Sequence, residues 1–189
     1  MICHMELREL KSERLVLRKV RREDVSAYYR NLGSSEAVTR GMLWNPHQDF
    51  SESVASVEKT LRRYEAGRCY RWAITRKGED LLMGVIDLLR FDEETGSCSF
   101  AYMLGEHFWG QGYGTEALRA VFRFAFREME IREIIADHMS DNPASGAVMR
   151  KAGMTFRRHL PQRYEKNGRT FDAEEYRITK CAWQEAENS

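Results

Sequence analysis

The chain has 189 residues and a formal net charge of +1, with 42% hydrophobic and 31% charged residues. This balance predicts one globular domain spanning residues 1–189, and the near-neutral charge argues against nucleic acid or a membrane as a partner. The four cysteines are scattered, which predicts neither a zinc site nor a disulfide framework and fits a reducing cytoplasm. No signal peptide is visible, and the longest apolar run, residues 81–89, is too short to span a bilayer.

Apolar periodicity and glycine positions predict the elements in chain order. One strand precedes two helices separated by an irregular segment; three strands joined by short turns follow, and then a helix, a strand, a short helix and a hairpin. The predicted bounds are 14–20, 22–32, 51–66, 69–76, 81–91, 97–104, 115–129, 132–139, 141–153, 154–159 and 171–180, with the irregular segment at 34–50.

The order of these elements predicts the fold class. Three strands joined by short turns form an antiparallel meander, whereas the strand–helix–strand unit across residues 97–139 implies one parallel pair. The sequence therefore predicts an α/β fold of the α+β kind, in which helices flank a central mixed, mostly antiparallel sheet.

The most informative stretch runs from Trp109 to Ala117, where Gly110, Gly112 and Gly114 lead directly into an amphipathic helix. The first turn of a helix has free backbone N–H groups and favours negative charge, and glycines let a bulky anion approach closely. A pyrophosphate group is the natural ligand. The loop has no lysine after its last glycine, as an NTP-binding loop requires, and its spacing is not that of a dinucleotide-binding loop.

The stretch from Tyr102 to Leu118 resembles the acetyl-CoA-binding motif of the GCN5-related N-acetyltransferases (GNAT superfamily). Its Trp-Gly-x-Gly-Tyr-Gly-Thr-Glu-Ala pattern is similar to that of the RimJ/RimL-type branch. The order of predicted elements from Leu15 to about Trp183 also resembles the GNAT acyl-CoA N-acyltransferase fold. The resemblance implies that backbone groups contact the pantetheine and acetyl group at Met103 and Leu104, and the pyrophosphate at Gln111, Gly112, Tyr113, Gly114 and Thr115.

A second motif begins at Asn142-Pro143-Ala144-Ser145 and ends at Gly153. Asn142 suits the N-cap of a helix and Pro143 its first turn. The motif resembles the family's Asn-x-x-Ser helix beside acetyl-CoA. Many superfamily members use a tyrosine seven residues after the asparagine to protonate the departing thiolate, but Met149 occupies that position here. The resemblance therefore assigns the acid role to Ser145, whose hydroxyl can hydrogen-bond the sulfur as it gains charge.

The catalytic base is assigned less directly. Counting back from the Asn167-Gly168 turn, the acidic position of the branch falls on Tyr164, and Glu165 is the adjacent acid, so both are candidates. A solvated or helix-capping charge is the simpler interpretation of the other candidates, and an ordered water relay could replace a single base. These other candidates are Glu116, Asp137, His138 and Asp87.

The acceptor side should involve the early helices and the irregular segment, because loops carry binding residues. The candidates there are Trp44, His47, Phe50, Tyr64 and Arg68. The five histidines show no metal-ligand spacing, so no metal site is predicted.

The resemblance implies an enzyme, an N-acetyltransferase that uses acetyl-CoA as cosubstrate. The acceptor would be a primary amine, either a protein N-terminus or a small molecule, because fold and cosubstrate do not fix the acceptor. A non-catalytic acyl-CoA-binding sensor or regulatory module is the alternative. The absent tyrosine favours that alternative slightly, whereas Ser145 argues against it. The final hairpin would leave an apolar edge, so the protein is predicted to be a monomer or a homodimer.

Overall fold

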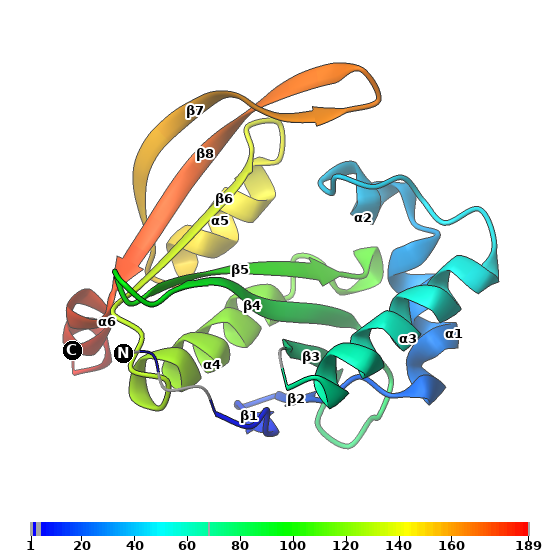
Figure 1. The fold of residues 1–189 in the computed structure, drawn as a ribbon, viewed down its shortest axis with the longest axis horizontal. Helices are drawn as coiled ribbons and strands as arrows, with labels where there is room; N and C mark the ends of the chain where they lie inside the picture. Colours follow the sequence, from blue (N-terminus) through cyan, green and yellow to red (C-terminus); the bar gives the residue numbers. More distant parts are fainter. Residues whose placement is uncertain (1, 3–4, 68, 189) are drawn as a thin grey trace.

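The computed structural model describes residues 2, 5–67 and 69–188. Within these residues, eight strands form one sheet in the order β1-β2-β3-β4-β5-β6-β8-β7 (Figure 1). The β5–β6 pair is parallel and every other neighbouring pair is antiparallel, which confirms the predicted mixed, mostly antiparallel sheet. The strands are β1 (Leu10–Lys11), β2 (Leu15–Arg18), β3 (Tyr70–Arg76), β4 (Gly84–Asp92), β5 (Ser97–Leu104), β6 (Glu133–Met139), β7 (Thr155–Lys166) and β8 (Arg169–Thr179).

Helices cover the two faces of this sheet. The helices are α1 (Val25–Tyr28), α2 (Glu36–Arg40), α3 (Phe50–Glu65), α4 (Tyr113–Arg127), α5 (Pro143–Lys151) and α6 (Lys180–Glu187). Helix α4 packs its apolar stripe, including Leu118, Val121 and Phe122, into the larger core with residues of β2 to β6. Helices α1 and α3 form a smaller core on the opposite face, against Ala73 and Val85.

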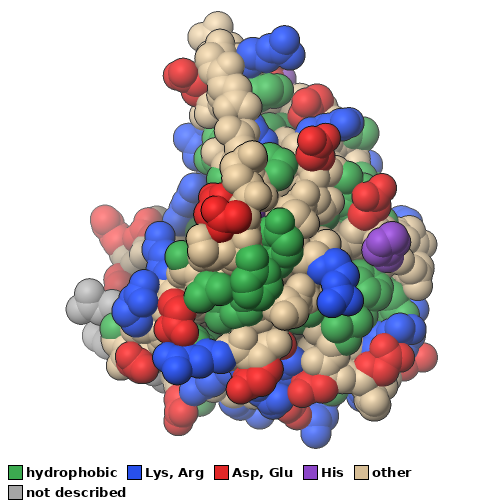
Figure 2. Space-filling view, turned by 90° about the vertical axis from the view of Figure 1, so that its right-hand side faces the viewer, with side chains coloured by type: hydrophobic (Ala, Val, Ile, Leu, Met, Phe, Trp, Pro, Cys, Tyr) green, Lys and Arg blue, Asp and Glu red, His purple; other side chains and the backbone are tan. Residues whose placement is uncertain are grey.

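The parallel pair of β5 and β6 is short, and this positions the site. The strands are in register only at Ser97 with Glu133 and at Cys98 with Ile134. Beyond that point they separate, and Figure 1 shows β5 staying with β4 while β6 rises with β7 and β8. The hairpin of β7 and β8 projects as a ridge above the body of the protein (Figure 2). A split therefore opens between the carboxyl ends of β5 and β6.

The first half of the chain departs from the prediction in two places. The helix expected at 22–32 is divided into a 3₁₀ turn (Arg22–Asp24), helix α1 and a π turn (Tyr29–Gly33). Buried Asp24 accepts two hydrogen bonds of 2.8 Å from the Arg18 guanidinium, which fixes the first turn in its tight form. The segment expected to be irregular contains helix α2, because Ser35 caps a single turn by accepting a bond from the Val38 N–H.

The other differences lie at element ends. Strand β4 begins at Gly84 rather than at residue 81, and the short strand β1 was not predicted. Strand β7 continues to Lys166, well beyond residue 159, because a register shift between Leu160 and Tyr164 lets pairing with β8 continue. Thr179 caps helix α6, where only a strand end was expected. Among the described residues, no helix is long and apolar enough to cross a membrane, and no group of three potential ligands could hold a metal ion.

Candidate functional site

The N-terminus of α4 differs from those of the other long helices. Helices α3, α5 and α6 each begin with a side chain that accepts a bond from a first-turn N–H; the capping residues are Asp49, Asn142 and Thr179. Helix α4 has Gly112 as its N-cap residue, and glycine has no side chain to accept such a bond. The N–H groups of the first turn of α4 therefore have no side-chain cap. They adjoin the glycine loop, which the sequence predicts to bind an anion.

The glycine loop is held in shape by contacts from outside it. Gly112 has φ +82, a conformation that side chains disfavour. Trp109 donates from its indole nitrogen to the Leu104 carbonyl at 2.7 Å and so ties the loop to the end of β5. Arg14 donates to the Gln111 carbonyl at 3.1 Å, and its guanidinium lies 4.6 Å from the centre of the Tyr113 ring. The loop is therefore anchored on both sides.

A cavity of about 680 Å³ lies where this loop, the end of β5, helix α2 and the start of α5 meet. Most of the residues predicted to contact acetyl-CoA line it. They are Met103, Leu104, Gly112, Tyr113, Gly114, Thr115, Asn142 and Ser145. Gln111 does not line the cavity, and its side chain instead donates to the His107 carbonyl at 2.8 Å. The structure thus gathers residues from positions 103 to 145 around one cleft.

Helix α5 presents its first turn to this cleft. Asn142 is its N-cap, as predicted, and accepts a bond of 3.3 Å from the Ser145 N–H. Gly41 of the segment after α2 approaches so closely that a Cβ there would lie 2.7 Å from the Asn142 amide nitrogen. Tyr102 of β5 also lines the cleft, and burial raises its pKa while a hydrogen bond with Ser145 partly offsets that rise. Ser145 is therefore paired with a phenol hydroxyl inside the cleft.

The two hairpin candidates lie elsewhere. Tyr164 and Glu165 belong to β7 and do not line the cleft. The Tyr164 hydroxyl donates to the Asp137 carboxylate on β6, and Arg163 also donates to Asp137. Burial, followed by the bond to Asp137, raises the pKa of Tyr164 to about 12. Tyr164 is thus a hydrogen-bond donor at neutral pH, whereas Glu165 is exposed at the surface of the hairpin.

Three other base candidates have structural partners. Glu116 accepts bonds from Ser12 and Arg14, which ties the start of α4 to the turn between β1 and β2. Asp87 is buried and paired through both oxygens with Arg71, at 2.7 and 3.0 Å. His138 is also buried, and its Nδ1 bonds the Met139 carbonyl at 2.8 Å. These contacts favour structural roles.

The four acceptor-side candidates that the structure describes lie outside the cleft lining. Tyr64 bonds the backbone at Val20 and Arg71 and is a core residue. His47 bonds Ser53 at 2.7 Å and packs against Trp44. Phe50 is 46% exposed at the start of α3. Arg68 lies outside the described residues.

Two contributors were missed from the sequence. Tyr102 follows the alternation of the core face with Cys98 and Phe100, so its hydroxyl gave no signal of its own. Arg14 precedes a strand almost a hundred residues before the loop that it contacts, and no local pattern connects the two. The glycine pattern identifies the loop, whereas the residues that support it come from distant segments.

Comparisons with known proteins agree with this geometry. A family model described as an acetyltransferase (GNAT) domain matches residues 14–155. The uncharacterized N-acetyltransferase YoaA of Bacillus subtilis is 25% identical over 171 residues, which cover 90% of this chain and 96% of that protein. The ribosomal-protein-serine acetyltransferase of Escherichia coli is 26% identical over 153 residues, covering 80% and 84%. A GNAT-family acetyltransferase structure from Bacillus anthracis has a TM-score of 0.82 at 22% identity, covering 92% and 99%, and shares the fold.

Proposed function

Because the chain belongs to the GNAT acetyltransferase family and is an acetyltransferase enzyme, we propose that it transfers the acetyl group of acetyl-CoA directly to a primary amine. The observation that carries this proposal is the start of α4, which has no side-chain cap and opens on the split between β5 and β6. The pyrophosphate would bind the N–H groups of residues 112–115, and the pantetheine arm would enter the split beside Met103 and Leu104. Residues 1–189 would act as one N-acetyltransferase domain.

The acid for the departing thiolate would be Ser145. The amine nitrogen forms a bond to the thioester carbonyl carbon, the C–S bond breaks, and the sulfur takes up a proton as it leaves. Ser145 lines the cleft at the first turn of α5, and its interaction with Tyr102 supplies a second hydroxyl to support it. Met149 is 2% exposed in the core and has no proton to give. The serine therefore does what a tyrosine does in many relatives.

The amine would approach from the face of the sheet opposite α4. Asp137 lies three residues beyond Ile134 on β6, and Ala101 lies three residues beyond Cys98 on β5, so the two hold equivalent positions on the strands that border the split and point to the same face of the sheet. The Asp137 carboxylate, which accepts a hydrogen bond from Tyr164, would take the proton that the amine releases, directly or through one water. Tyr164 is then a positioning residue rather than a base, since its pKa of about 12 keeps it protonated.

The chemical class of the acceptor amine is part of this proposal. A protein N-terminus would fit the relationship with the ribosomal-protein-serine acetyltransferase, whereas the fold alone is equally compatible with a small-molecule amine. A non-catalytic acyl-CoA sensor would keep the same α4 geometry, so only turnover separates the two functions. The catalytic function requires a ternary complex in which acetyl-CoA and the amine meet at the split.

The test is an amine panel incubated with acetyl-CoA and monitored by thiol release, with mass spectrometry of the products. Amino acids, N-terminal peptides of ribosomal proteins and polyamines would make up the panel. We expect thiol release in step with an acetylated amine. Tight CoA binding by calorimetry without acetylation of any amine would instead support the sensor.

A further inference from the structure

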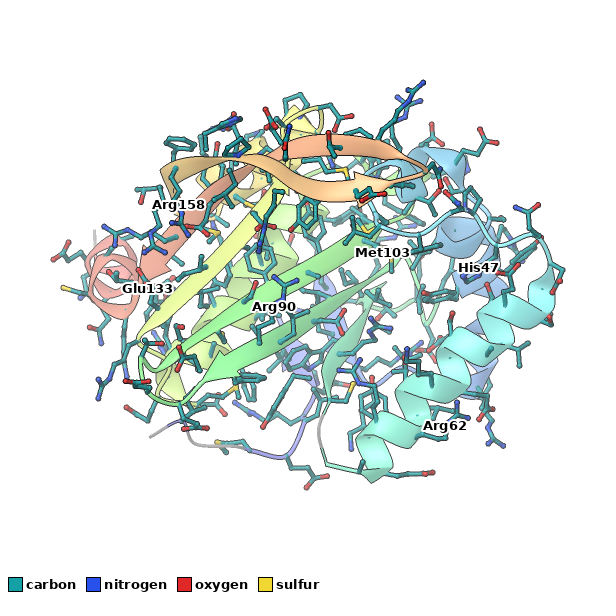
Figure 3. All side chains as sticks on the ribbon, turned by 45° about the horizontal axis from the view of Figure 1, so that its top comes forward. His47, Arg62, Arg90, Met103, Glu133 and Arg158 are labelled. Atoms are coloured by element: carbon teal, nitrogen blue, oxygen red, sulfur yellow. The ribbon has the colours of Figure 1, made fainter. Side chains whose placement is uncertain are left out.

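The sheet face opposite α4 is exposed to solvent near its centre. Ala101 of the central strand β5 is exposed, although its neighbours on that strand's end, Met103 and Leu104, are buried. Helices α1 and α3 cover one side of this face, and the β7–β8 hairpin rises on the other (Figure 3). This is the face from which the acceptor would approach Asp137.

The hairpin tip is fastened to the segment around α2, and this closes the far end of the face. Lys166 donates from Nζ to the Thr39 carbonyl at 2.7 Å. The side-chain amides of Asn45 and Asn167 exchange two hydrogen bonds of 3.0 Å each. An acceptor on this face is therefore surrounded by strand residues and by these hydrogen bonds between the hairpin tip and the segment around α2.

The carboxylates on this face are already paired. Asp137 accepts hydrogen bonds from Tyr164 and Arg163, and both carboxylate oxygens of Asp87 accept hydrogen bonds from Arg71. Glu175, opposite Asp137 on β8, is buried and bonded to Arg158 at 2.9 Å. A polyamine acceptor needs unpaired carboxylates for its additional ammonium groups, and these three pairs do not offer them.

Arg90 of β4 differs from these paired carboxylates, because it is a positively charged side chain without an ion pair among the described residues. Figure 3 shows it over the middle of the sheet, on the face that α4 does not cover. Among the described residues, no carboxylate pairs with it, yet it lies near enough to Tyr164 to lower that residue's pKa against the larger effect of burial. Its φ is +53, at the register shift between Leu89 and Asp92. Non-glycine residues rarely adopt this left-handed conformation, and it is enriched at functional sites.

We propose that Arg90 binds an anionic group of the acceptor, so that the substrate is an amine that also carries a carboxylate, such as an amino acid. This inference rests on the proposed function and deepens it. The guanidinium matches a carboxylate through two parallel hydrogen bonds. Lys166 donates from Nζ to the Thr39 carbonyl, pairs with no carboxylate in the part of the chain that the structure describes, and adds positive charge to the same face. The carboxylate of the acceptor thus binds the Arg90 guanidinium, while the amine of the same molecule lies at the split between β5 and β6.

The test compares matched acceptors in the wild type and in two variants. The acceptors are alanine, leucine and phenylalanine, each with its amide, and kcat/KM is measured with acetyl-CoA. Arg90→Met should lower kcat/KM for the amino acids by about 10- to 100-fold and leave the amides nearly unchanged. Because each amine is compared with itself in wild type and variant, its intrinsic reactivity cancels. Arg62→Met, which changes an exposed arginine on α3 away from this face (Figure 3), should change neither.

A binding measurement separates this inference from the proposed function. The CoA-saturated protein is titrated with N-acetyl-phenylalanine and with its amide, and the acid should bind more tightly only while Arg90 is present. If no amine is acetylated but this preference holds, the transfer proposal fails and the anion site stands. Equal binding of acid and amide, or an equal effect of Arg90→Met on both acceptor types, would overturn the anion site.

Discussion

The two sides of the split between β5 and β6 are built in different ways. On the α4 side, backbone groups and glycines shape the surface, and Gly112 replaces a capping side chain. On the opposite face, where Ala101 is exposed, polar and charged side chains extend from several strands, among them Arg90, Asp137 and Tyr164. Under the proposed function, one side would recognise a constant ligand, acetyl-CoA, through backbone geometry, and the other would recognise a variable ligand, the acceptor amine, through side-chain chemistry. Substitutions should therefore separate binding of CoA from recognition of the acceptor.

The largest effect should come from Gly112→Val. The left-handed φ of +82 disfavours any side chain by about 1–2 kcal/mol, and a branched one would also occupy the approach to the first-turn N–H groups of α4. We expect calorimetry to detect no CoA binding.

Gly168→Val is the matched control for this change. Gly168 has φ +73 and open space around it, but it lies at the tip of the β7–β8 hairpin. Its substitution carries the same backbone strain without affecting CoA. Undiminished CoA affinity in Gly112→Val would contradict the backbone account of this side.

The next largest effect should come from Ser145→Ala. Losing one hydrogen bond to developing charge typically costs roughly 10²–10³ in rate, so turnover should fall by that factor. Affinity for acetyl-CoA should change little, because the contact matters mainly in the transition state. Ser26→Ala makes the same chemical change at an exposed position of α1 and should leave turnover intact. Full turnover in Ser145→Ala, with chemistry shown to be rate-limiting, would transfer the acid role to Tyr102 or water.

A smaller effect is expected from Tyr164→Phe. Losing the bond that orients Asp137 should lower turnover about 10-fold. Because the pKa of Tyr164 is raised to about 12, the phenol stays protonated between pH 7 and 10. The pH–rate profile of the variant should therefore have the same shape as that of the wild type, with a lower rate at every pH. A rising limb in this range that disappears in Tyr164→Phe would show that the phenolate is the base.

The smallest effect is expected from Glu165→Gln. Glu165 is exposed on β7 next to Tyr164, and the change removes a charge that has no role in this account. Turnover should stay within about twofold of wild type, as is usual for surface positions. A 100-fold loss of turnover in this variant, with folding preserved, would make Glu165 rather than Asp137 the group that accepts the proton.

The same difference between the two sides explains what the sequence could predict. The alternation of Gly110, Gly112 and Gly114 before an amphipathic stretch is local, so the loop and the helix could be predicted from adjacent residues, whereas acetyl-CoA was expected only from the family resemblance. Strand β5 was predicted with its observed bounds for the same reason. On the other face, Asp137 and Tyr164 meet only through the pairing of β6, β8 and β7, which no local pattern encodes. Arg90 depends on an irregular pairing of β4 that periodicity does not reveal.

The most direct test of the two-sided account is an initial-rate experiment in which the concentrations of acetyl-CoA and of a free amine that the enzyme acetylates are varied together. Both sides of the split must be occupied at once for direct transfer, so double-reciprocal plots should intersect. No acetylated protein should accumulate when acetyl-CoA is supplied alone. Parallel plots, together with an acetyl group found on the protein by mass spectrometry, would contradict direct transfer, because they are the signature of a covalent intermediate.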